Sequence, residues 1–186
     1  VISFVRSISP HEKACYHHIE FPSYKGVEVE VHYRPSFLLC FWHNRKLQKY
    51  YERMKDEQFS HRVILGEQGE IAIPTVEFNL IFQLTHIYAH LMNEGIGLRQ
   101  LLDYYYVLSM LNVNCEMLTS LQKELKELGL WKFAGGIMYI MQEVFGMPAS
   151  RLIVPPNEKY GKFVLNEVLE AGNFGRHDAR NRFGRS

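Results

Sequence analysis

The sequence predicts an α+β protein in which a small mixed or antiparallel sheet is followed by a bundle of about five helices. Apolar and polar side chains alternate from Val27 to Arg34, which is the period-two pattern of a strand with one apolar face. From Val76 onward, long apolar and amphipathic segments are separated by glycine, proline or asparagine. The predicted parts are a sheet-containing part, a helical part and a basic tail, which are residues 1–73, 74–171 and 172–186.

Length and composition indicate one globular domain, or one and a part. The chain has 186 residues, of which 47% are hydrophobic and 22% charged, and both values are ordinary. The net charge of +1 argues against binding nucleic acid through the whole surface. No apolar run reaches the length of about 18 residues that predicts a membrane span, and no signal-peptide pattern opens the chain. Three scattered cysteines (Cys15, Cys40 and Cys115) predict free thiols in a reducing cytoplasm.

The first part is predicted to contain two hairpins around a charged helix. In chain order we expect a strand at 1–5, a helical turn at 11–15, strands at 16–21 and 27–34 joined by a loop at 22–26, a helix at 43–58, and strands at 62–65 and 70–73. The helix at 43–58 has a single apolar stripe, formed by Leu47, Tyr50, Tyr51 and Met54. Its charged surface is expected to face water.

The second part is predicted to contain the five helices, at residues 76–92, 98–111, 115–128, 130–145 and 158–171. Thr75 and Asn114 are expected to cap the first and third of them, because their side-chain oxygens can accept from free N–H groups at a helix start. Gly129 is expected to end the third helix. The pair Gly135-Gly136 predicts a point where a neighbouring helix approaches the fourth helix closely.

The polar face of the strand at 27–34 is the first candidate site. Glu28, Glu30, His32 and Arg34 follow one another at a spacing of about 7 Å, since residues i and i+2 of a strand share a face. The paired strand is expected to add His18 and Glu20 to this face. Such a row could hold a divalent cation between oxygen ligands, or it could be a solvated edge of compensating charges. Because neighbours on a strand point to opposite faces, we expect at most one of His17 and His18 to join it.

His86 and His90 are the second candidate, because residues four apart on a helix share a face. Zinc proteases use this spacing, but Ile87 stands where those enzymes need a glutamate base, and spacing marks no third ligand. The two readings are a zinc site and a pair of buried histidines that bond to backbone or carboxylate groups and support a nearby site.

Arg99 and Asp103 are the third candidate and can pair across one helical turn. Arg99 follows Gly95-Ile96-Gly97, and glycines at a helix start let backbone N–H groups approach a phosphate. The pair is therefore predicted to be either phosphate-binding or structural.

Taken together, several segments resemble the uncharacterised nucleotidyltransferase-like family common in gut Bacteroidetes, a branch of the polymerase-beta-type nucleotidyltransferase superfamily. The segments are Gly26–Tyr33, Pro74–Glu77, His86–His90, Gly95–Gln100 with Asp103, and Gly172–Gly175. They occur in the order of the family over most of the chain. The resemblance implies that residues 1–73 are a partial nucleotidyltransferase-like domain and that the helical part closes over the nucleotide and the acceptor.

The resemblance also implies a magnesium-dependent reaction. In the superfamily, a Gly-Ser turn and an Asp-x-Asp pair bind the phosphates of a nucleoside triphosphate and two Mg²⁺ ions, and a third carboxylate completes the metal site. Glu30 matches that third carboxylate and is the implied catalytic metal ligand. Glu28 is the other candidate ligand, and His32 and His18 would hold the ligands in place. The acceptor is unknown.

The chain departs from the family pattern, because it contains neither a Gly-Ser turn nor an Asp-x-Asp pair. Either these elements lie upstream of Val1, or the protein is a degenerate relative that has lost them. In both cases we expect that this chain alone does not catalyse nucleotide transfer. One alternative is a non-catalytic interaction module, in which the apolar helices and the basic tail form a surface for a partner. The basic tail is also the one segment that we expect could contact nucleic acid. A weaker alternative is a metal-dependent hydrolase that uses His86 and His90.

Overall fold

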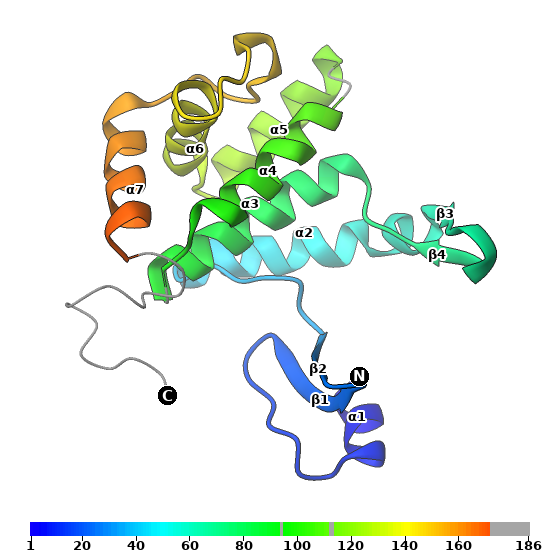
Figure 1. The fold of residues 1–186 in the computed structure, drawn as a ribbon. Helices are drawn as coiled ribbons and strands as arrows, with labels where there is room; N and C mark the ends of the chain where they lie inside the picture. Colours follow the sequence, from blue (N-terminus) through cyan, green and yellow to red (C-terminus); the bar gives the residue numbers. More distant parts are fainter. Residues whose placement is uncertain (94, 112–113, 172–186) are drawn as a thin grey trace. The chain divides into compact units, whose positions relative to one another are not determined.

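The computed structural model describes residues 1–93, 95–111 and 114–171, and it divides into two compact units between Phe37 and Leu38 (Figure 1). The α+β class is confirmed: the described residues form seven α-helices and two antiparallel two-stranded sheets. The basic tail at 172–186, with its family-like segment at 172–175, lies outside the described residues. The assignment of residues 1–73 to a partial nucleotidyltransferase-like domain and of residues 74–171 to a separate helical domain stays a prediction.

The N-terminal unit, Val1–Phe37, contains one short helix and one hairpin. These elements are α1 (Ile2–Ile8), β1 (His18–Tyr24) and β2 (Val27–His32). The strands pair antiparallel, with His18 opposite His32 and Glu20 opposite Glu30. Lys25 and Gly26 form the turn with φ angles of 51° and 79°, which is the left-handed pair that a tight two-residue hairpin turn requires.

Three local predictions for this unit are wrong. The expected strand at 1–5 is the helix α1, because so short an apolar run does not distinguish the two structures by its pattern. The expected helical turn at 11–15 does not form: a turn covers residues 10–11, and Ala14 bridges Ile19. The expected loop at 22–26 is only two residues long, because β1 continues to Tyr24 through a register shift that accommodates Pro22.

The second unit, from Leu38 onward, is the helical bundle with one small hairpin. Its elements are α2 (Phe41–Ser60), β3 (Arg62–Ile64), the short 3₁₀ turn η1 (Gly66–Gln68), β4 (Glu70–Ala72), α3 (Val76–Asn93), α4 (Leu98–Met110), α5 (Cys115–Glu127), α6 (Trp131–Glu143), η2 (Ala149–Arg151) and α7 (Glu158–Ala171). Among the described residues, no helix is long and apolar enough to cross a bilayer.

The two predicted helix caps and the predicted stop at Gly129 are confirmed. Thr75 Oγ1 accepts from the N–H of Phe78 at 3.3 Å, and Asn114 Oδ1 accepts from the N–H of Met117 at 2.7 Å. Gly129, with φ +70°, ends α5. The N–H of Gly129 donates to the carbonyl of Lys126 at 3.1 Å, and the N–H of Leu130 donates to the carbonyl of Leu125 at 2.8 Å. These two bonds satisfy carbonyl groups that the last turn of the helix leaves without a partner.

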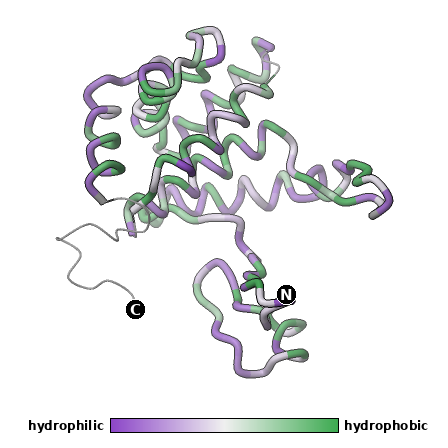
Figure 2. Tube along the Cα trace, in the orientation of Figure 1, coloured by the Kyte–Doolittle hydropathy of each residue, from purple (hydrophilic) through white to green (hydrophobic). Residues whose placement is uncertain are grey.

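The helix α2 packs into the bundle through its predicted apolar stripe. Leu47, Tyr50 and Tyr51 are buried, and Met54 packs against the same core. The Tyr51 hydroxyl is within 2.8 Å of Thr85 Oγ1 on α3, so a buried hydrogen bond joins the two helices. In Figure 2 the helices of the bundle carry both polar and apolar residues, as amphipathic helices around a shared core do.

Glycines allow α6 to contact α7 and the segment before it. A Cβ atom added to Gly135 would lie 3.1 Å from Asn157 Cβ, and one added to Gly136 would lie 3.1 Å from Tyr160 Cδ1. The close approach predicted at this pair is therefore confirmed. On the α7 side, a Cβ atom on Gly161 would lie 2.7 Å from both Cβ and Cγ of Tyr139.

Replacing Gly161 with alanine is expected to lower the free energy of unfolding by about 1–3 kcal/mol, because the methyl group overpacks the helix contact. Tyr139 cannot swing away, since its own Cβ is one of the clashing atoms. In a Tyr139→Gly background, which removes that Cβ atom as well as the ring, the same change should instead stabilise by up to about 1 kcal/mol, since alanine favours a helix over glycine. Urea denaturation of the four proteins of this cycle measures both values, and an equal cost in the two backgrounds would contradict the prediction.

Candidate functional site

The hairpin brings one carboxylate between two imidazoles. Glu30 Oε1 lies 3.7 Å from His18 Nε2, and Glu30 Oε2 lies 3.2 Å from His32 Nε2. The side chain of Glu30 is 55% exposed, while those of His18 and His32 are 19% and 32% exposed. The carboxylate is thus held by its neighbours and remains open to solvent.

The register of the strands explains this arrangement. Residues directly opposite in an antiparallel pair share a face, and so do residues i and i+2 of one strand. His18 opposite His32, and Glu20 opposite Glu30, therefore lie on one face, as the alternation predicted. Glu28 is exposed on the same strand but lies outside the groups of metal-binding side chains found among the described residues.

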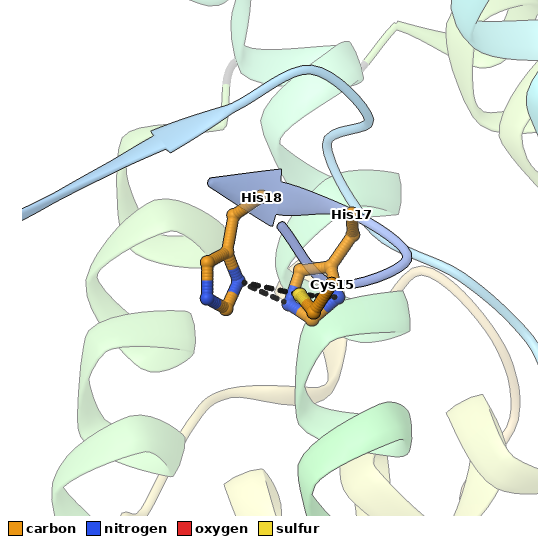
Figure 3. Close-up of side chains that lie close together, drawn as sticks. All are labelled: Cys15, His17 and His18. Carbon is orange, nitrogen blue, oxygen red and sulfur yellow. Dashed lines mark hydrogen bonds between the residues drawn. The ribbon is translucent and has the colours of Figure 1, made fainter. Parts of the chain in front are cut away.

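Cys15 and His17 join this cluster, which sequence reasoning missed. Cys15 Sγ lies 3.2 Å from His18 Nδ1 and 3.5 Å from His17 Nδ1, and His17 Nε2 lies 3.1 Å from His18 Nδ1. Figure 3 shows the three side chains turned toward one another. The expectation that His17 and His18 point apart is wrong, because His17 lies in a bend before β1, where strand alternation does not apply. The spacing Cys-x-His-His ahead of a strand was the available signal.

The bundle carries a second cluster, in a cavity of about 450 Å³ between α3 and α4. Six residues line it: Gln83, His86, Ile87, Gln100, Asp103 and Tyr106. His86 and His90 share a face as predicted, with their Nε2 atoms 3.1 Å apart and hydrogen-bonded. Both rings are half-buried. Within the described part of the chain, no third Cys, His, Asp or Glu joins them in a group that could hold a metal ion.

The start of α4 offers fewer free groups to a phosphate than its glycines suggested. The side chain of Gln100 turns back and accepts from the N–H of Gly97 at 3.1 Å, so this donor is already used. Arg99 and Asp103 are both exposed and form no ion pair with each other. Asp103 instead faces the cavity that contains His86.

The residues around Glu30 fit part of a magnesium site. Proteins bind Mg²⁺ through one or two carboxylates, completed by substrate phosphates and water. Glu30 offers one exposed carboxylate, and its cross-strand partner Glu20 lies on the same face. The imidazoles of His18 and His32 are not preferred ligands of this ion, and they serve here to orient the carboxylate.

The described chain is thus an α+β protein in which a hairpin with a solvent-open carboxylate is followed along the sequence by a helical bundle. The chain belongs to the family described as uncharacterised nucleotidyltransferase, whose model matches residues 6–146. The matched region begins in α1 and extends past α6, so it includes the hairpin and both clusters. No curated protein and no solved structure matches the chain.

Proposed function

We propose that this chain takes part in the transfer of a nucleotidyl group from a nucleoside triphosphate to an acceptor hydroxyl, with Glu30 as a catalytic metal ligand. The observation that carries the proposal is the family match over residues 6–146. The geometry of the hairpin supports it, because the carboxylate of Glu30 is exposed and is oriented by two imidazoles. In the reaction, the acceptor oxygen bonds to the α-phosphorus, the bond to the bridging oxygen breaks, and pyrophosphate and the hydroxyl proton leave.

The residues of this chain have distinct proposed roles. Glu30 supplies one oxygen ligand to Mg²⁺, with Glu28 as the alternative ligand two residues away, and His18 and His32 fix the carboxylate. Magnesium bound there would supply the positive charge that polarises the α-phosphate. Arg99 is exposed at the start of α4, where its guanidinium is available to a phosphate.

Transfer also requires ligands that the 186 residues lack, because they contain no Asp-x-Asp pair. We therefore propose that the isolated chain is inactive and that a complete protein supplies the pair from outside these residues. One glutamate cannot hold two metal ions.

A non-catalytic interaction module is the second candidate, and one observation favours it. The helix α4 carries exposed apolar side chains at intervals of four residues, so they form a stripe on one face. The stripe consists of Leu98, Leu102, Tyr106 and Met110. Contiguous exposed apolar surface of this kind marks interaction sites. An Asp-x-Asp strand in the full reading frame favours the enzyme, and an unrelated upstream domain favours the module.

A titration of the full-length protein with nucleoside triphosphates and Mg²⁺ tests the proposed function. We expect release of pyrophosphate and incorporation of an α-phosphate label, both lost without Mg²⁺. The 186-residue chain, assayed in parallel, should show neither. Transfer by the isolated chain would contradict the requirement for further ligands. A full-length protein that contains an Asp-x-Asp strand and yet neither binds nor turns over any nucleoside triphosphate would contradict the function itself.

A further inference from the structure

We propose that the N-terminal unit contains a Zn²⁺ site formed by Cys15, His17 and His18, separate in chemistry from the magnesium chemistry proposed for Glu30. One thiol and two imidazoles are the donors that select zinc over magnesium, which prefers oxygen. The three side chains each offer one ligand atom, and these atoms lie within 4.8 Å of one another. They come from four consecutive residues just before and at the start of β1.

The distances between the donors suit a tetrahedral ion. Zinc bonds of about 2.3 Å to sulfur and about 2.0–2.1 Å to nitrogen place ligand atoms about 3.6 Å apart for S and N, and about 3.3 Å apart for two N atoms. The Sγ of Cys15 lies 3.2 and 3.5 Å from the Nδ1 atoms of His18 and His17. The nitrogen of His17 that lies 3.1 Å from His18 Nδ1 is Nε2, whereas its Nδ1 is the atom near Cys15. The His17 ring therefore has to turn for one of its nitrogens to face both partners, and the three ligand atoms already lie within 4.8 Å of one another.

The far side of His18 carries the partner that zinc-binding histidines usually have. Such a histidine binds the metal through one ring nitrogen and donates the other N–H to a carboxylate. His18 presents Nδ1 to Cys15, and its Nε2 lies 3.7 Å from Glu30 Oε1. His32 holds the other oxygen of this carboxylate at 3.2 Å. With an ion bound, a shift of Glu30 by several tenths of an ångström would let its carboxylate accept from His18 Nε2, which would complete a chain of metal, imidazole and carboxylate across the two strands.

Backbone hydrogen bonds hold the ligand-bearing segment in place. The N–H of Cys15 donates to the carbonyl of His18 at 2.9 Å, and the N–H of Tyr33 donates to the carbonyl of His17 at 3.0 Å. The hydroxyl of Tyr33 also donates to the carbonyl of Cys15. The first bond closes the segment on itself, and the two bonds of Tyr33 join it to the residue after β2, so the donors are positioned before any ion binds.

The size of the unit supplies a reason for a metal. All of Val1–Phe37 is described, and Val5 and Ile19 are its only fully buried apolar side chains. Units of fewer than about 40 residues usually need a metal, a disulfide or a partner to stay folded. The three cysteines are free, so a disulfide does not serve this purpose. With three protein ligands, a fourth position on the ion stays open to water.

Zinc binding to the chelator-treated chain, in competition with a chromophoric chelator, tests the proposal. We expect one Zn²⁺ per chain, and Co²⁺ in its place should show a thiolate charge-transfer band in the near ultraviolet. Cys15→Ser should lower the affinity at least tenfold and abolish that band. Glu30→Gln should lower the affinity by about 10–100-fold with the band retained, since it removes only the outer partner.

Two control variants report on the other candidate donors. Cys40→Ser removes an exposed cysteine of the helical unit, and His90→Gln removes half of the α3 histidine pair; both should bind zinc as the unmodified chain does. Equal affinity in the unmodified chain and Cys15→Ser would overturn the assignment. So would a loss confined to His32→Gln and Glu30→Gln, which would locate the ion among His18, Glu30 and His32 instead. No nucleotide enters this assay, so its failure leaves the proposed transfer function untouched.

Discussion

Replacing Glu30 with glutamine is expected to reduce Mg²⁺-dependent transfer by the full-length protein at least about 100-fold. Glutamine keeps the shape of the side chain and one hydrogen-bond acceptor for His18 or His32, but it removes the negative charge that holds a cation. Removing an outer partner of a metal ligand already costs about 10–100-fold in activity, so removing the ligand should cost more. Initial rates of pyrophosphate release across a Mg²⁺ titration measure the effect.

Three comparisons make this result specific. Glu70→Gln, an exposed glutamate on β4 in the other hairpin, should leave the rate within about twofold of the unmodified protein. Glu28→Gln separates the two candidate ligands, and a loss that follows Glu28 rather than Glu30 would move the assignment. Every assay contains zinc at a concentration that saturates Glu30→Gln, and the zinc content of each variant is measured beside its rate, so that a loss of transfer reports on magnesium rather than on zinc. Full activity in Glu30→Gln would refute the metal role.

The shared polar face of the hairpin could be predicted because its cause is local. The alternation from Val27 to His32 fixes which side chains share a face, and burial of Ile19 with Val31 opposite it fixes the register. These two facts place His18 and Glu30 on the same face of the hairpin, as diagonal neighbours on the paired strands. The length of the turn escaped prediction, since Lys25-Gly26 is not one of the asparagine- or aspartate-glycine pairs that announce a two-residue turn.

The rest of the hairpin cluster depends on a bend that the sequence pattern does not encode. Strand alternation assigned His17 to the opposite face, yet β1 starts one residue later and His17 turns toward His18. Cysteine spacing alone does not mark Cys15, because that rule looks for pairs of cysteines and overlooks a cysteine beside histidines. The side chains of residues just outside a strand or helix follow no regular alternation, so a sequence pattern does not predict their contacts and a three-dimensional structure is needed.

The cavity between α3 and α4 shows a second limit of sequence reasoning. Spacing along one helix correctly joined His86 to His90. It could not predict that Asp103 of α4 would line the same cavity as His86, because the packing of two helices decides that. Spacing also suggested that Asp103 would pair with Arg99, but an exposed pair of this kind gains at most about 0.5 kcal/mol, which is too little to determine where Asp103 lies.

Zinc removal is expected to loosen the N-terminal hairpin and to leave the helical unit unchanged. An ion that binds the folded unit but not the unfolded one stabilises it by RT ln(1 + [Zn²⁺]/Kd), or about 2.7 kcal/mol when zinc is present at 100 times its dissociation constant. Opening of the hairpin should therefore become about 100-fold more frequent in chelator. With only Val5 and Ile19 fully buried in this unit, packing offers little to offset the loss.

Amide hydrogen exchange resolved by residue measures this difference within one molecule. The N–H groups of Glu20 and Tyr33, which are bonded to Lys13 and His17, should exchange about 100-fold faster after chelation, because local opening governs their exchange. Amides of α3 and α6 serve as the internal control and should not change. Cys15→Ser should exchange at the fast rate in zinc and in chelator alike, since it lacks the ligand through which zinc acts.

Equal protection of Glu20 and Tyr33 with and without zinc, in a chain shown to bind the ion, would mean that the metal does not stabilise the fold.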